Sequence, residues 1–136
     1  MVSTPRQEIP RRGDIFWADL PSAESVGSEQ YGRRPVLVLS ADTINRSLPI
    51  CIVVPLTSVL DKAKTNRQHR IIILERYKIA DPSDPNYSLC KGDSLALTEQ
   101  IRCISRNRLG DRRVASVEPI GVNAVEAGVR YVLGLI

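Results

Sequence analysis

The chain has 136 residues, of which 43% are hydrophobic, a usual size for one domain with a single core. Its 19 lysines and arginines outnumber its 15 acids, and the net charge of +4 permits a polyanionic partner without requiring one. No stretch reaches the roughly 20 apolar residues of a membrane span, and the N-terminus has no apolar signal core, so we expect a cytoplasmic protein.

Short apolar, β-branched runs separated by turns indicate an antiparallel sheet. We predict strands at Ile15–Leu20, Pro35–Ser40, Ile50–Leu56, His69–Glu75, Ser94–Leu97 and Gln100–Ile104. Asp42 is expected to cap a short helical turn between the second and third strands. Pro119 suits a first helical turn, and Val125, Val129 and Val132 follow at helical spacing, which predicts a C-terminal helix.

No repeat or linker divides the chain. We therefore predict one domain over residues 1–136, with residues 1–11 as a flexible N-terminal extension. The predicted fold class is mainly β with α, in which the C-terminal helix packs on a strongly bent antiparallel sheet.

Side chains that commonly act as catalytic bases or metal ligands are sparse. His69 is the only histidine, which excludes a ribonuclease that uses two histidines as base and acid. Cys51, Cys90 and Cys103 lack metal-ligand spacing, and Cys51 and Cys103 lie in apolar runs typical of core positions. We therefore expect no metal and no cofactor.

A polar, glycine-bounded loop at residues 27–32 precedes the strand predicted at residues 35–40. The loop carries Glu29, and Pro35 restricts the preceding Arg34 to an extended conformation, which gives its guanidinium a defined direction. Side chains at a loop–strand junction are held by the sheet and remain open to solvent. This junction is the predicted functional site.

The segments Arg12–Leu20, Gly27–Ser40, Val54–Ser58 and Thr98–Ile104 together resemble the MazF/PemK family of bacterial toxins, in order and with compatible spacing. The resemblance implies an SH3-like barrel of the PemK/CcdB toxin type, usually a homodimer. It also implies a metal-independent endoribonuclease that cuts single-stranded RNA, chiefly messenger RNA, at short sequence motifs. A cognate antitoxin would inhibit it.

Under this resemblance Arg34, Thr57 and Glu29 match active-site positions of the family. RNA supplies its own nucleophile, because the 2′-hydroxyl can attack the adjacent phosphorus to leave a 2′,3′-cyclic phosphate and a 5′-hydroxyl. An arginine can pair with two phosphate oxygens, and a threonine hydroxyl can add a hydrogen bond as charge develops. Glu29 either acts as the base or orients Arg34. Each residue also has an ordinary alternative: an ion pair, a turn cap or loop surface.

Basic loops on either side of this site would follow a single-stranded phosphate backbone, with polar side chains reading unstacked bases. The alternative is a solvated charged face. Trp17 is expected in the core rather than as a stacking platform. The predicted RNA contacts are Ser28, Gln30, Tyr31, Lys64, His69, Gln100 and Arg102.

Two rival functions belong to other classes. A toxin of the same fold that binds DNA gyrase would need no nuclease site, and the match at Arg34, Thr57 and Glu29 argues against it. A non-catalytic RNA-binding barrel would keep the basic loops without needing the arginine–threonine pair.

Overall fold

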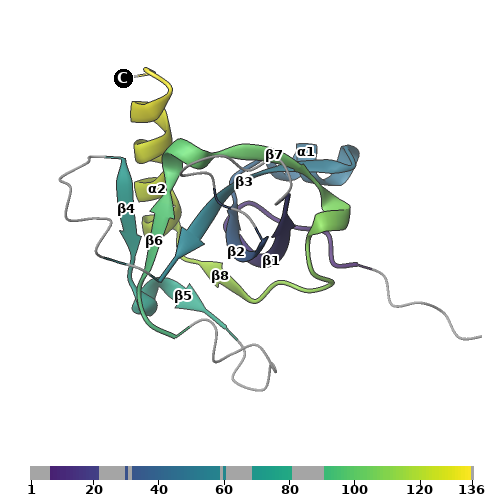
Figure 1. The fold of residues 1–136 in the computed structure, drawn as a ribbon, viewed down its shortest axis with the longest axis horizontal. Helices are drawn as coiled ribbons and strands as arrows, with labels where there is room; N and C mark the ends of the chain where they lie inside the picture. The colour runs from purple at the N-terminus through teal and green to yellow at the C-terminus, as the bar shows by residue number, and fades with distance from the viewer. Residues whose placement is uncertain are drawn as a thin grey trace, which may run out of the picture.

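The computed structural model describes residues 7–21, 30, 32–58, 60, 69–80 and 91–135. Within these residues a strongly bent antiparallel sheet has the strand order β4-β6-β3-β2-β1-β8-β5, and β7 pairs with β3 off this path (Figure 1). The strands are β1 Asp14–Leu20, β2 Gly32–Val38, β3 Ile50–Thr57, β4 Arg70–Ile73, β5 Lys78–Ile79, β6 Ser94–Leu97, β7 Arg102–Ser105 and β8 Ala115–Val117.

Each predicted strand is present, Ser94–Leu97 with its predicted bounds and the others with shifted ends, and two further strands appear. β5 and β8 have two and three residues, too few to show an alternating pattern in the sequence. The predicted strand at Gln100–Ile104 begins only at Arg102, because residues Thr98–Gln100 form the 3-10 turn η4. This difference changes the direction of the Gln100 side chain, with consequences for the site.

Both predicted helical segments are present, but the predicted cap is wrong. Helix α1 spans Asp42–Ser47, and its N-cap is Ala41, which makes no side-chain capping bond. Asp42 instead accepts a hydrogen bond from the backbone N–H of Arg12, at 2.8 Å. Helix α2 spans Pro119–Val132 and starts with its proline, where no backbone N–H is needed.

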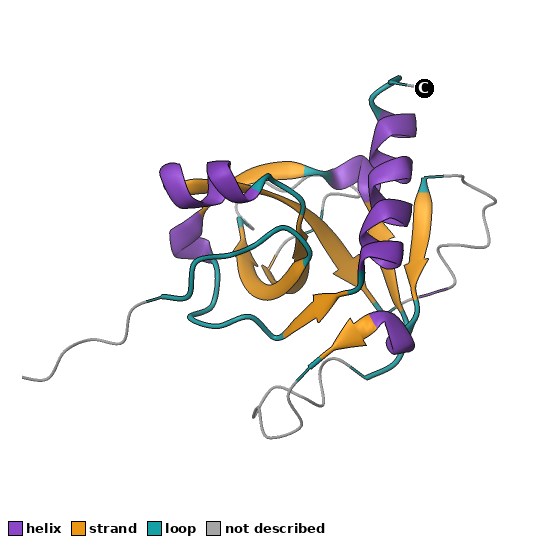
Figure 2. Cartoon of the chain, turned by 180° about the vertical axis from the view of Figure 1, so that it is seen from behind, coloured by secondary structure: helices purple, strands orange, loops and turns teal. Residues whose placement is uncertain are grey.

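Strand alternation divides the core between the two faces of the sheet. Ile15, Leu37 and Val54 belong to one cluster, and α2 packs onto that cluster through Val125 and Val129 (Figure 2). The second cluster contains Phe16, Ala18, Val36, Val38, Cys51, Val53 and Ile104. The central residues of β1, β2 and β3 are therefore covered on both faces and form a rigid support.

The cysteines divide between core and surface. Cys51 is fully buried, as predicted, and burial raises the pKa of its thiol to about 11. The core position predicted for Cys103 is wrong: Cys103 is exposed, because it lies opposite Ile52 on the outer face of the β3–β7 pair. Cys90 lies outside the described residues.

The described part of the predicted N-terminal extension contacts the rest of the chain. The Gln7 side chain donates hydrogen bonds to the carbonyls of Arg106 and Leu109, at 2.8 and 3.2 Å. The backbone N–H of Glu8 donates to the carbonyl of Asp111 at 2.8 Å. Among the described helices, none is long and apolar enough to cross a membrane.

Candidate active site

Arg34 and Thr57 lie at the ends of two neighbouring strands. In the β2–β3 register Val36 lies opposite Pro55, so two further residues along each strand reach Arg34 on β2 and Thr57 on β3. Because side chains alternate along a strand, Arg34 and Thr57 project from the face that carries Val36 and Pro55. Arg34 is exposed and Thr57 is buried. The pair combines an accessible guanidinium with a sheltered hydroxyl.

The adjacent arginines of β2 project from opposite faces of the sheet. Arg34 lies opposite Ala18, a member of the second core cluster, whereas Arg33 lies opposite Asp19. The Arg33 guanidinium lies over the indole of Trp17, 5.3 Å from the ring centroid. Trp17 packs against the first core cluster, in agreement with its predicted core position. Only Arg34 of the two therefore shares a face with Thr57.

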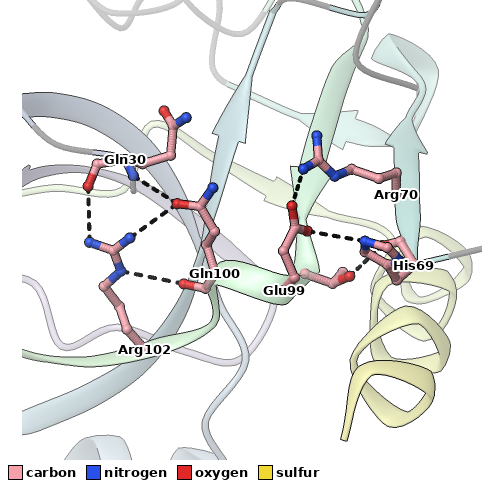
Figure 3. Close-up of polar contacts among 7 residues, drawn as sticks. Gln30, His69, Arg70, Glu99, Gln100 and Arg102 are labelled. Carbon is pink, nitrogen blue, oxygen red and sulfur yellow. Dashed lines mark hydrogen bonds and ion pairs between the residues drawn. The ribbon is translucent and has the colours of Figure 1, made fainter. Parts of the chain in front are cut away.

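Gln30, Gln100 and Arg102 form a polar network (Figure 3). The backbone N–H of Gln30 donates to Oε1 of Gln100 at 2.7 Å, and the backbone carbonyl of Gln30 accepts from Nη1 of Arg102 at 3.1 Å. Arg102 also donates to the carbonyl and to Oε1 of Gln100, both at 3.3 Å. We call these three residues the Gln30 network. The side chain of Gln30 itself points away from it (Figure 3).

A second network, formed by His69, Arg70 and Glu99, lies on the other side of η4 (Figure 3). Arg70 forms an ion pair with Oε1 of Glu99, and Nε2 of His69 lies 3.6 Å from Oε2 of the same carboxylate. The His69 ring stacks on Tyr131 of α2, with 6.2 Å between ring centroids. His69 is thus held by two contacts inside the fold. Arg70 belongs to a basic loop that the sequence predicted beside the site, whereas Glu99 escaped the prediction, although it adjoins Gln100 in one of the motifs.

Several predicted residues lie outside the described part of the chain: Ser28, Glu29, Tyr31 and Lys64. In the ranges that are described, His, Cys, Asp and Glu side chains form no group of three or more that could hold a metal ion. Burial raises the pKa of the Asp14 carboxyl group. Asp14 lies at the opposite end of β1 from the residue paired with Arg34.

Comparisons with known proteins give a consistent result. A family model described as the PemK-like, MazF-like toxin of type II toxin–antitoxin systems matches residues 11–133. Endoribonuclease EndoA of Bacillus subtilis is 37% identical over 128 residues, covering 94% of this chain and 97% of the relative. Endoribonuclease MazF of Staphylococcus saprophyticus is 39% identical over 102 residues, covering 75% and 73%.

Solved structures share the fold. MazF from Deinococcus radiodurans aligns with a TM-score of 0.64 at 23% identity, covering 93% of this chain and 98% of that one. An endoribonuclease in complex with its cognate antitoxin, from a mycobacterial species, aligns with a TM-score of 0.57 at 22% identity, covering 93% and 94%. The predicted fold class, a toxin-type barrel with a C-terminal helix, is confirmed.

Proposed function

This chain belongs to the family of PemK-like, MazF-like toxins of type II toxin–antitoxin systems, and from that premise we propose that it is a toxin endoribonuclease that cuts single-stranded RNA. The observation that carries the proposal is the arrangement of Arg34 and Thr57. They occupy adjacent strand ends and project from one face of a sheet that is covered on both sides. Such a support holds a guanidinium and a hydroxyl ready for a phosphate before it arrives.

In the proposed reaction the substrate provides the nucleophile. The 2′-oxygen attacks the adjacent phosphorus, so that the O2′–P bond forms while the P–O5′ bond breaks. A base accepts the 2′-hydroxyl proton and the departing 5′-oxygen takes up a proton, which leaves a 2′,3′-cyclic phosphate and a 5′-hydroxyl. No metal is required to generate the nucleophile. Glu29 is the proposed base or the residue that orients Arg34.

Arg34 and Thr57 would stabilise the charge that develops in this step. The planar guanidinium of Arg34 can donate to two phosphate oxygens at once, a geometry that a lysine ammonium cannot reproduce. The Thr57 hydroxyl can donate to an oxygen whose charge grows as the phosphorane forms. Ser28, Gln30, Tyr31, Lys64 and His69 remain proposed contacts to the rest of the RNA strand.

Two protein partners complete the proposal. Exposed aliphatic side chains on several elements, among them Ile52, Ile72, Leu133 and Leu135, leave apolar surface that a second copy of the chain would cover in a homodimer. The antitoxin named for a solved relative suggests a cognate antitoxin here as well. Its acidic segment would complement the basic site. Sedimentation at micromolar concentration checks the dimer, and a stable, active monomer would contradict it.

The direct test is incubation of the purified protein with a long RNA of mixed sequence in excess chelator. We expect discrete fragments, and we expect none with the Arg34→Ala variant. Intact RNA together with inhibited DNA gyrase would replace the proposal with the gyrase-binding alternative. RNA that is bound but not cut would favour a non-catalytic RNA-binding barrel.

A further inference from the structure

Side chains from distant segments engage both polar backbone groups of Gln30. Gln30 is buried, yet its N–H and its carbonyl bind Gln100 and Arg102, some seventy positions further along the chain. A buried backbone group without a partner is strongly unfavourable, so these contacts fix the chain at this point. The chain then continues through Gly32, the first residue of β2, to Arg34.

The guanidinium of Arg102 is directed at protein oxygens. Its Nε, Nη1 and Nη2 atoms each donate to an acceptor in the Gln30 network, at distances of 3.1–3.3 Å. Oε1 of Gln100 accepts from both Gln30 and Arg102. This geometry differs from the RNA contacts predicted for Gln100 and Arg102, because Oε1 of Gln100 and the guanidinium of Arg102 already form hydrogen bonds within the protein.

The Gln30 network rests on a rigid base. Gln100 ends η4, in which Thr98 is fully buried and donates its hydroxyl hydrogen bond to the carbonyl of His69. Helix α2 packs closely against the same turn. A Cβ atom added at Gly128 would lie only 3.1 Å from Cγ2 of Thr98. The network therefore holds the chain that enters β2 in a fixed position relative to η4.

Arg102 also ties the network to the strand that carries Thr57. It lies opposite Val53 on β3, and the side chains of Arg102, Val53 and Thr57 share one face by strand alternation. The network thus spans both halves of the candidate site, the chain that leads to Arg34 and the strand that ends at Thr57.

We propose that Gln100 and Arg102 are positioning residues, which hold the backbone of Gln30 and thereby direct Arg34 toward the scissile phosphate beside Thr57. This inference rests on the proposed ribonuclease function. A positioning role for Gln100 differs chemically from a role in reading a base. Positioning requires only an acceptor oxygen at residue 100, whereas reading a base edge with an amide uses its N–H donors as well.

Gln100→Glu separates the two roles, because glutamate keeps the acceptor for Gln30 and Arg102 and loses the amide donors. The experiment compares Gln100→Ala, Gln100→Glu and the wild type in single-turnover cleavage of an oligonucleotide that spans a mapped cleavage site. Affinity is measured with the same oligonucleotide carrying deoxyribose 5′ to the scissile phosphate. Gln7→Ala is the matched control, since it also removes a glutamine side chain that binds the backbone of a distant segment, here by donating to the carbonyls of Arg106 and Leu109.

We expect Gln100→Ala to slow cleavage on the order of tenfold to a hundredfold, the size of a small misplacement of a catalytic group. Its RNA affinity and cleavage sites should remain those of the wild type. Gln100→Glu should restore most of the rate, and Gln7→Ala should cleave normally. A Gln100→Glu variant as slow as Gln100→Ala, or one with altered cleavage sites, would overturn positioning in favour of direct base contact.

Hydrogen exchange at the Gln30 amide tests the network without any cleavage. The amide should be protected in the wild type and in Gln100→Glu, and should exchange faster in Gln100→Ala. Equal exchange rates of the Gln30 amide in the wild type and in both variants would overturn the network itself. Wild-type protein that cuts no RNA would instead overturn the proposed function, while the exchange result would still decide whether the network exists.

Discussion

At the scale of single residues, neighbouring arginines have different surroundings. Arg33 lies over the Trp17 ring on one face of β2, and Arg34 shares the other face with Thr57. Removing a donor that stabilises developing charge typically lowers the rate by about 10²–10³-fold. We therefore expect Arg34→Lys to lose cleavage by that order, since a point charge cannot replace a planar fork, and Arg33→Ala to change it little. Initial rates of RNA cleavage check this.

The control for this comparison is stability. Arg33→Ala removes a cation–π contact that is worth about 0.5–1 kcal/mol at an exposed site, so its effect should appear in thermal unfolding rather than in the cleavage rate. Equal losses of cleavage at both positions in folded variants would mean that the wrong guanidinium has been assigned to the phosphate.

Asp14 gives a residue-level prediction about pH. Burial raises the pKa of its carboxyl group, although hydrogen bonds from Arg11 and Ser116 oppose the shift. The folded state therefore binds the proton more tightly than the unfolded state. The contribution of Asp14 protonation to the stability of the folded state is complete below pH 3.8, the ordinary pKa of the group. It is lost as pH rises through the raised pKa of the folded state. Asn at this position stays neutral at both pH values. The free energy of unfolding of Asp14→Asn, compared with that of the wild type, should therefore be higher at pH 7 than at pH 4. Urea unfolding at both pH values checks this, and a difference independent of pH would contradict it.

The family resemblance pointed to Arg34 and Thr57 as site residues, but the sequence could not predict the Gln30 network, for a physical reason. The motifs that carry the resemblance are patterns of side chains, whereas Gln100 and Arg102 bind the backbone of Gln30. Every residue except proline carries the same backbone donor and acceptor, so no side-chain pattern marks such a contact. The core position predicted for Cys103 was wrong for a related reason, because an apolar run does not show which face of a strand is covered.

At the scale of elements, the main departure from prediction is η4. The sequence pattern extended a strand back to Gln100, whereas the strand begins at Arg102. The 3-10 turn directs the side chains of Glu99 and Gln100 to separate networks on either side of it. Its position depends on α2 and β3, which pack on it from other parts of the sequence, and local propensity carries no information about that packing.

At Gly128, α2 packs closely against this turn and the neighbouring strand β4. A Cβ there would lie 2.9 Å from Cγ1 of Ile71 and 3.0 Å from the backbone carbonyl of His69, which cannot move as a side-chain tip can. Helix propensity favours alanine over glycine by about 1 kcal/mol. Overpacking of this kind typically destabilises by about 1–3 kcal/mol, so we expect Gly128→Ala to lower the free energy of unfolding.

The matched control for Gly128→Ala is Asn123→Ala, on an exposed position of the same helix. It gains helix propensity without a new contact and should be neutral or slightly stabilising. Chemical denaturation of both variants makes the comparison. A stabilised Gly128→Ala variant would show that the helix can move away from η4, and the rigid support inferred for Gln100 would then be wrong.

At the scale of the whole molecule, the sheet joins the segments on which the proposed chemistry depends. β3 pairs with β2 at Val36–Val38, with β6 at Leu56 and Thr57 and with β7 at Arg102. These contacts join parts of the chain that are distant in sequence, and the covered faces of β1, β2 and β3 hold them in place. The proposed reaction needs such a support, because the substrate brings its own nucleophile and the protein has only to position one bond and stabilise its charge.

The whole-molecule prediction concerns that nucleophile. If the 2′-hydroxyl attacks, replacing the single ribose 5′ to the scissile phosphate with deoxyribose should abolish cleavage. Binding should hardly change, because the backbone charges that hold the strand remain in place. The substituted strand should therefore compete with the normal substrate, and cleavage of the normal substrate should persist in excess chelator. Products of the normal substrate should resist ligation at their 3′ ends until the cyclic phosphate is opened. Cleavage of the deoxy-substituted strand at a normal rate would mean that an activated water attacks instead. In that case Arg34 and Thr57 would still face the phosphate, but a base on the protein would have to act on water rather than on the substrate's own hydroxyl.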